Sequence, residues 1–313
     1  MAQIRQVLRH LLATHRCTDI HIPAPAAGQP ITVVTPTGPV RTRHHPTDAD
    51  IAHLIAAGRR AADRPFGLAD PTLDAEVTID GRRCRLAAVG PPLAPGVAVT
   101  LRVQPDRHRT LADLIRGGML PARIAAWLRD RLHAGGALLI AGPRGAGKTT
   151  LCGAAMAALP AETRIITIED TPELPVAVLR EAGRDVQPLH ADPTSTTHTP
   201  TAAVRAALRL GDSALIIGEV RGPEVKAVYE AIRVGAQSEA VLATIHGGTP
   251  QAVRDRITID LGVSEQSFRH TDAIVCCGRD GDQYLITEIA TVTDGGFGQV
   301  YTSSTAPASS RAT

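Results

Sequence analysis

The chain has 313 residues, which is long for one compact core and predicts two domains. Apolar residues make up 43% of it but aromatic residues only 2%, so the core must be built from aliphatic side chains, and base-stacking platforms for nucleic acid are disfavoured. Lys and Arg number 33 against 31 Asp and Glu, and the resulting net charge of +2 is too small to indicate direct binding of nucleic acid.

The five cysteines and the N-terminus exclude further classes of protein. No two cysteines have CxxC spacing, so neither a zinc site nor a disulfide framework is predicted. The adjacent Cys276 and Cys277 lie in the strand-like run TDAIVCCG and are interpreted as buried apolar side chains rather than a redox pair. The N-terminal stretch is interrupted by Arg and His, and no segment reaches the ~20 apolar residues of a membrane span, so we expect a cytoplasmic protein with at most a peripheral membrane role.

Residues 1–105 predict a small α+β domain. The segment IRQVLRHLLATH has apolar residues at helical spacing. Short β-type segments follow, separated by Pro, Gly and Asp, with the helical stretch DADIAHLIAAGRRAAD among them. These segments are DIHI, PITVVTP, GPVRTR, EVTIDGRRCRLAAV and GVAVTLRV. The charged stretch QPDRHRT at 104–110 is interpreted as a hinge.

Residues 106–313 predict an α/β domain with a mainly parallel sheet. Two helices come first, and the second is amphipathic, with Ile124, Trp127, Leu128 and Leu132 on one side. Apolar strands then alternate with helices, which is typical of a parallel sheet covered by helices. The strands are ALLIAG, RIITIED, ALIIGE and AVLATIHG, and the helices are KTTLCGAAMAALP, PTAAVRAALRLG, PEVKAVYEAIRVG and PQAVRDRITIDLG. TDAIVCC, QYLITEIATV and GQVYTSS are predicted to close the sheet, and TAPASSRAT to form a frayed tail.

One glycine-rich loop fits the pattern G-x-x-x-x-G-K-[ST] over Gly142–Thr149. It lies between a predicted strand and a predicted helix, which is the context of a phosphate-binding P-loop. Its glycines let successive backbone N–H groups turn toward one anion, and the helix N-terminus adds the positive end of its dipole. Lys148 is expected to reach the β- and γ-phosphates and Thr149 to bind Mg²⁺. A glycine-rich turn with a chance lysine is the weaker interpretation in this context.

Three later strand ends carry polar residues suited to phosphate chemistry. Glu219 follows a buried strand, one residue after Gly218, which takes the place of the usual strand-end Asp; it can align or deprotonate attacking water, or be a surface residue after a core strand. Glu169 and Asp170 can hold Mg²⁺ or the nucleophile, although Asp170 can instead cap the next turn. His246 ends another apolar strand, as a structural residue or as a ligand sensor.

In this order the four segments resemble the type II/IV secretion ATPase superfamily, the hexameric motors of type II secretion, type IV pili, archaella and type IV secretion. The family carries a Walker A loop, an acidic Asp box, an atypical Walker B ending in Gly-Glu, and a His box. Here they read GPRGAGKTT, TIEDTPEL, ALIIGEVRGPE and VLATIHGGTPQAVRDRI. The resemblance covers roughly residues 105–290 and is greatest to the archaeal branch. The first histidine of the His box, usual in a TGH sequence, is missing, because the chain reads VGAQSEA.

The resemblance implies a RecA-like ATPase domain, ATP and Mg²⁺ as cofactors, a homohexameric ring, and a polytopic membrane platform protein as partner. The implied nucleotide-binding residues are Gly142, Pro143, Arg144, Gly145, Ala146, Gly147, Lys148, Thr149, Thr150 and Arg221, with Arg205 and Arg209 as further candidates. The implied catalytic residues are Lys148, Glu169, Glu219 and His246, and the implied Mg²⁺ ligands are Thr149, Glu169 and Glu219.

Arginines of the N-terminal domain form a separate candidate set. The two-residue period of a strand places Arg83 and Arg85 on one face, and Arg102 is expected on a neighbouring strand. In the family, arginines at such positions reach the nucleotide. We therefore expect Arg83 and Arg85 to bind it, and Arg102 to neutralise charge that develops at the γ-phosphate. A solvated edge strand is the alternative.

The sequence thus predicts an ATP-hydrolysing motor of a type II secretion or type IV pilus-like system, at the cytoplasmic face of the membrane. The missing His-box histidine leaves open a nucleotide-binding scaffold that hydrolyses little. A conjugative type IV secretion ATPase is a further alternative. A P-loop kinase is disfavoured, because it needs an arginine-bearing lid and an acceptor pocket that the sequence does not indicate.

Overall fold

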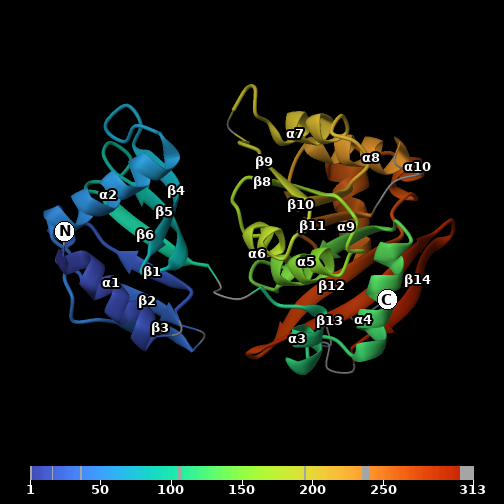
Figure 1. Cartoon of the computed structure of the whole chain (residues 1–313), viewed down its shortest axis with the longest axis horizontal. Coiled ribbons are helices and arrows are strands. Elements are labelled where there is room, and N and C mark those ends of the chain that lie inside the picture. The colour runs from blue at the N-terminus through green and yellow to red at the C-terminus, as the bar shows by residue number, and fades with distance from the viewer. Residues whose placement is uncertain are drawn as a thin grey trace. The chain divides into compact units, whose positions relative to one another are not determined.

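The computed structural model describes residues 2–15, 17–35, 37–104, 108–193, 195–234 and 240–303. It divides into two compact units, residues 1–107 and 108–313, each with a sheet and a core of its own (Figure 1). Residues 105–107 of the expected hinge, residues 235–239 of the VGAQSEA stretch and the tail from residue 304 lie outside the described residues.

The N-terminal unit is an antiparallel sheet with two helices packed on one face. Its elements are α1 (Ala2–Thr14), β1 (Asp19–Ile22), the short 3-10 helix η1 (Pro25–Ala27), β2 (Thr32–Thr35), β3 (Gly38–Arg41), α2 (Asp48–Ala62), β4 (Thr72–Ile79), β5 (Arg82–Val89) and β6 (Ala98–Val103). The strand order is β3-β2-β1-β6-β5-β4. Residues alternate strictly between exposed and buried along β4, and the buried ones join apolar side chains of both helices in one core. The other face of the sheet is polar.

The C-terminal unit is a sheet between two layers of helices (Figure 1). Its elements are α3 (Leu111–Arg116), α4 (Ala122–His133), β7 (Ala137–Ala141), α5 (Lys148–Ala157), β8 (Ile165–Glu169), α6 (Val176–Glu181), β9 (Val186–His190), α7 (Pro200–Ala207), β10 (Ala214–Val220), α8 (Glu224–Val234), β11 (Val241–Ile245), α9 (Pro250–Asp255), the π-helical turn η2 (Arg256–Asp260), α10 (Glu265–Phe268), β12 (Ala273–Asp280), β13 (Gln283–Thr293) and β14 (Gly296–Thr302).

This sheet is parallel over six of its strands, which confirms the predicted α/β class. Its order is β14-β13-β12-β7-β11-β10-β8-β9, and only β13 and β14 pair antiparallel with their neighbours. All five residues of β7 are buried, because helices cover both faces. Leu138 and Ile140 enter the core that contains α4 and α5, and Leu139 enters the core that contains α7 and α8.

Cys276 and Cys277 are both buried, as predicted, and neither is in a disulfide. Since they are neighbours on β12, they point to opposite faces of the sheet. Cys277 belongs to the core on the α5 side and Cys276 to the core on the α8 side.

Some elements differ from the sequence prediction. The helix expected over PQAVRDRITIDLG is α-helical only to Asp255 and continues as the π-helical turn η2. Strand β9 was not predicted, because Pro188 interrupts its pattern; β9 is the edge of the sheet, where a missing N–H donor is tolerated.

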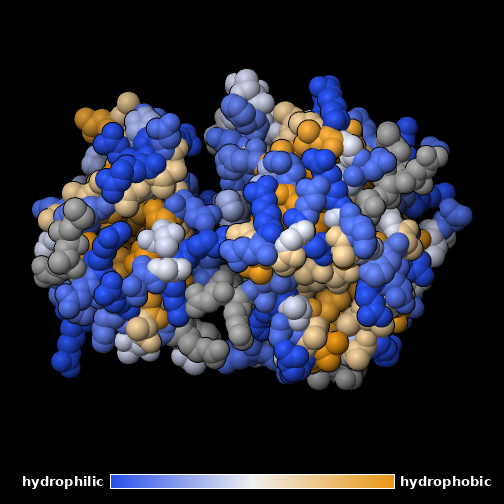
Figure 2. All heavy atoms as spheres, viewed as in Figure 1, coloured by the Kyte–Doolittle hydropathy of each residue, from blue (hydrophilic) through white to orange (hydrophobic). Residues whose placement is uncertain are grey.

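Most of the surface visible in Figure 2 is hydrophilic, with apolar residues in scattered groups. Among the described residues, no helix combines the length and the apolar composition that crossing a bilayer requires.

Candidate nucleotide site

The candidate residues gather at one edge of the C-terminal sheet. Strands β7, β11, β10 and β8 are adjacent and parallel, so their carboxyl ends meet at the same edge. The glycine loop follows β7, and His246 follows β11. Glu219 lies near the end of β10, and Glu169 ends β8. The fold therefore brings together four segments that span about a hundred residues of sequence.

The glycine loop has a backbone that requires glycine at defined points. Gly142, Gly145 and Gly147 have φ of 151°, 75° and 86°, conformations that other residues rarely adopt. At Gly142 an added Cβ would also lie 2.5 Å from the carbonyl oxygen of Cys277. Helix α5 begins directly after Gly147, and no side chain caps its N-terminus. An uncapped helix start behind such a loop presents N–H groups and a positive dipole end, which fits a phosphate group.

Among the described residues, Lys148 is the one basic residue whose side chain is buried at this edge. It is only 8% exposed, and its Nζ donates hydrogen bonds to the carbonyl oxygens of Gly142 (3.0 Å) and Pro143 (3.1 Å). Burial lowers the pKa of Lys148, and the negative charge of Glu219 acts against that effect.

The pairing of β10 with β11 is irregular at Glu219. The register of β10 with β11 shifts between Ile217 and Val220, the interval that contains Gly218 and Glu219, and such an irregularity re-aims the side chains within it. A Cβ on Gly218 would lie 2.9 Å from Cγ of Glu169 on the neighbouring strand. A side chain at position 218 would therefore require Glu169 to move.

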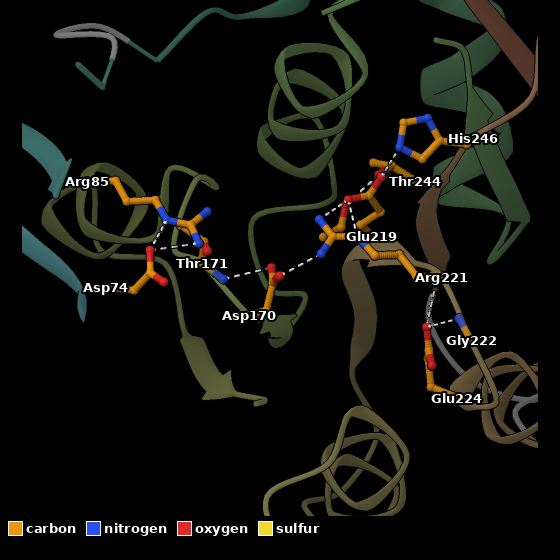
Figure 3. Close-up of polar contacts among 11 residues, drawn as sticks. Asp74, Arg85, Asp170, Thr171, Glu219, Arg221, Gly222, Glu224, Thr244 and His246 are labelled. Carbon is orange, nitrogen blue, oxygen red and sulfur yellow. Dashed lines mark hydrogen bonds and ion pairs between the residues drawn. The ribbon is translucent and has the colours of Figure 1, made fainter. Parts of the chain in front are cut away.

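Glu219 is held from two sides by basic side chains (Figure 3). His246 Nε2 lies 2.8 Å from Glu219 Oε1, and Arg221 Nε donates to Oε2 at 2.6 Å. Arg221 Nη1 also donates to Asp170 Oδ2 at 2.9 Å, so one guanidinium joins the ends of β8 and β10. His246, which the sequence left open between structure and function, contacts the candidate catalytic carboxylate.

Glu169 is in a different environment from Glu219. It is buried, and its Oε1 accepts hydrogen bonds from the backbone N–H groups of Glu173 (2.8 Å) and Leu174 (2.9 Å). Burial raises the pKa of its carboxyl group to about 7, although the two N–H groups act to lower it. Glu169 organises the turn after β8, and Asp170 also accepts from Thr171 N–H in that turn (2.8 Å).

Two residues of this site were missed by the sequence analysis. Glu224 is buried, and its Oε1 accepts from the backbone N–H groups of Arg221 (2.6 Å) and Gly222 (2.8 Å). Arg256 Nη2 donates to the carbonyl oxygen of Arg221 (3.2 Å). The sequence signal that could have identified Glu224 is its position directly after a proline at the start of a helix. No sequence pattern indicated Arg256.

A cavity of about 340 Å³ lies beside the ends of β8 and β10, under the start of α7. Its apolar wall includes Ile168, Val204 and Ile217, which belong to the core on the side of the sheet away from α5. Asp170 and Arg221 also line it.

The three N-terminal arginines lie on the polar face of their own sheet. Arg85 pairs in register with Arg102 of the neighbouring strand, as the sequence predicted. Each arginine has a carboxylate partner within the N-terminal unit: Arg83 with Glu76 (3.8 Å), Arg85 with Asp74 (3.3 Å; Figure 3) and Arg102 with Asp19 (2.9 Å). The remaining candidates, Arg205 and Arg209, are exposed.

The donor set fits Mg²⁺ bound together with a nucleotide. In the part of the chain that the structure describes, no group of three or more acidic, His or Cys side chains is arranged to hold a metal. Mg²⁺ at phosphate sites commonly uses one or two protein oxygens, the phosphates and water. Thr149 at the start of α5, Glu219 and Glu169 can offer such oxygens; both Glu219 oxygens contact basic side chains, and one Glu169 oxygen accepts two backbone N–H groups.

Residues 70–279 match the family described as Type II/IV secretion system protein. The chain is 35% identical over 212 residues to a protein of Mycobacterium tuberculosis (strain H37Rv) named for conjugal transfer; the match covers 65% of this chain and 56% of that protein. It is 31% identical over 235 residues to the type IV secretion system protein PtlH homolog of Bordetella bronchiseptica, with 67% of each chain covered. The chain thus spans only a little over half the length of the mycobacterial relative.

Two solved structures share the fold. The ATPase DotB of Legionella pneumophila has a TM-score of 0.66 at 17% identity, covering 93% of this chain and 80% of that one. The pilus retraction motor PilT with bound ADP has a TM-score of 0.66 at 21% identity, covering 88% and 78%. The RecA-like architecture expected from the motifs is similar to the fold of these two ATPases.

Proposed function

Because the chain belongs to the type II/IV secretion system protein family, we propose that it is an ATPase that hydrolyses ATP to ADP and phosphate. One observation carries this proposal: the glycine loop follows β7 and Glu219 lies near the end of β10, at the carboxyl edge of one parallel sheet with only β11 between those two strands. A triphosphate on the loop would thus have its terminal group directed toward a carboxylate.

Each residue of the site has a defined part in this reaction. The N–H groups of the loop and of the start of α5, including Thr150, bind the phosphates, and Lys148 exchanges its two carbonyl partners for phosphate oxygens. Thr149 and Glu219 would hold Mg²⁺, which would neutralise phosphate charge when bound. Glu219 orients or deprotonates the attacking water. Through its contact with Glu219, His246 links events at the γ-phosphate to β11.

For the N-terminal arginines we propose binding of a nucleotide phosphate. Arg83, Arg85 and Arg102 share one sheet face, and each already binds a carboxylate, which a phosphate oxygen can replace. Arg102 is assigned to the charge that develops in the transition state.

The protein works as a homohexameric ring that drives a membrane platform protein at the cytoplasmic face of the membrane, in pilin assembly or protein export. Relatives named for conjugal transfer and type IV secretion favour the type IV secretion branch as a second candidate. Size measurements with and without a non-hydrolysable ATP analogue test the ring. A monomer in both conditions would contradict it.

Phosphate release from ATP by the purified chain tests the activity. Glu219→Gln is expected to lower kcat about 100-fold or more while binding of a fluorescent ATP analogue persists. Glu230→Gln makes the same change at an exposed residue of α8 and serves as the control. Undiminished activity in Glu219→Gln would point instead to a contaminating enzyme and to the scaffold alternative.

A further inference from the structure

The guanidinium of Arg221 directs its donors at carboxylates of this site. Nε and Nη2 contact Glu219, and Nη1 contacts Asp170 (Figure 3). The sequence suggested Arg221 as a nucleotide ligand. Its geometry indicates a different role, because three nitrogens that bind two carboxylates fix the position of those carboxylates.

The backbone of Arg221 is also anchored, so the side chain starts from a fixed point. Its N–H donates to Glu224 and its carbonyl oxygen accepts from Arg256, while Gly222 N–H donates to the same Glu224 oxygen. Glu224 is only 5% exposed and thus ties the loop to the body of the unit. A rigid loop that presents an arginine to Glu219 is a supporting structure for that carboxylate.

We propose that Arg221 is the positioning residue of Glu219, and that Asp170 in turn positions Arg221. This inference rests on the proposed function, in which Glu219 acts on the attacking water. Arg221 holds Oε2 and His246 holds Oε1, so the carboxylate plane is set from both sides. A planar guanidinium presents donors in fixed directions to Glu219 and Asp170 at once, whereas an ammonium group lacks that fixed geometry.

Steady-state kinetics of Arg221→Met test the proposal. Loss of the clamp leaves Glu219 free to rotate, so kcat is expected to fall about 10- to 100-fold while KM for ATP and the Kd of a fluorescent ATP analogue stay within about twofold. Arg221→Lys is expected to restore only a minor part of kcat. Arg269→Met, which removes another half-exposed arginine from an ion pair in the same unit, is the matched control and should retain kcat.

A double variant separates an action through Glu219 from an independent one. In the Glu219→Gln background, single-turnover rates are expected to show no further loss on adding Arg221→Met. Losses that multiply, or a tenfold weaker Kd for the analogue, would overturn the proposal and make Arg221 a phosphate ligand. Unchanged thermal unfolding of Arg221→Met shows that its loss of rate is not loss of fold.

The two levels of inference fail in different ways. If the wild-type protein releases no phosphate, or if Glu219→Gln has no effect, the proposed ATPase function is wrong. If Glu219→Gln abolishes turnover but Arg221→Met and Glu219→Gln act independently, only the positioning role is wrong.

Discussion

Glu169 and Glu219 lie at the ends of two parallel strands that are neighbours in the sheet, yet their surroundings differ. Glu169, at the end of β8, is buried and accepts hydrogen bonds from backbone N–H groups of the turn that follows it. Glu219, near the end of β10, is bonded to two side chains that are each more than half exposed. We therefore expect Glu169 to contribute mainly to stability and Glu219 mainly to turnover.

The largest effect expected from this contrast is kinetic. Glu219→Gln should lower kcat for ATP about 100-fold or more, whereas Glu169→Gln should lower it less than about 10-fold, because an amide oxygen can still accept both N–H groups of the turn. Phosphate-release assays on the two variants side by side measure the ratio. Equal losses would remove the distinction and make Glu169 a partner in catalysis.

The second prediction concerns the pH dependence of stability. Burial raises the pKa of Glu169 to about 7, whereas an unfolded glutamate has a pKa of about 4.3. Between these values the folded chain binds more protons than the unfolded chain, so the stabilisation is present at low pH and is lost as pH rises toward 7. Relative to Glu169→Gln, the wild-type free energy of unfolding should fall on the order of 3 kcal/mol between about pH 4.5 and 8.

Fluorescence of Trp127 provides the measurement. It is the only tryptophan in the chain and lies on α4, so denaturant unfolding at the two pH values reports on the C-terminal unit alone. A pH-independent difference between wild type and variant would show that Glu169 titrates normally in the folded protein.

Removal of each side chain gives the third test. Glu169→Ala leaves the N–H groups of Glu173 and Leu174 without their acceptor and should cost about 2 kcal/mol of unfolding free energy. Glu219→Ala should cost less than about 1 kcal/mol, because its partners are well solvated. The same tryptophan signal compares them, and a larger cost at Glu219 would reverse the assignment.

A further small effect is expected at Gly218, a residue of β10 that lies beside Glu169 of β8. Gly218→Ala places a Cβ 2.9 Å from Cγ of Glu169 and should destabilise the unit by about 1 kcal/mol. Gly248→Ala, where an added Cβ meets no heavy atom within 4 Å, is the control. The cost should disappear in a Glu169→Ala background, where the obstructing atom is absent.

The parts of the site that the sequence predicted are those that depend on local pattern. The glycine loop, the apolar strands and the acidic ends all follow from residue type and spacing, and the alternation of strands and helices gave the parallel sheet. The contact of Arg221 with Asp170 joins residues 51 positions apart and depends on β8 lying beside β10. The lack of space for a side chain at position 218 depends on Glu169 of the neighbouring strand, which a pattern read along one strand does not include.

The opposite directions of Cys276 and Cys277 give the molecule two built-in reporters. Each thiol is shielded by a different layer of helices, so a maleimide can reach one only when the α5 layer opens and the other only when the α8 layer opens. Mass spectrometry of singly labelled protein during slow unfolding would therefore tell which layer separates from the sheet first.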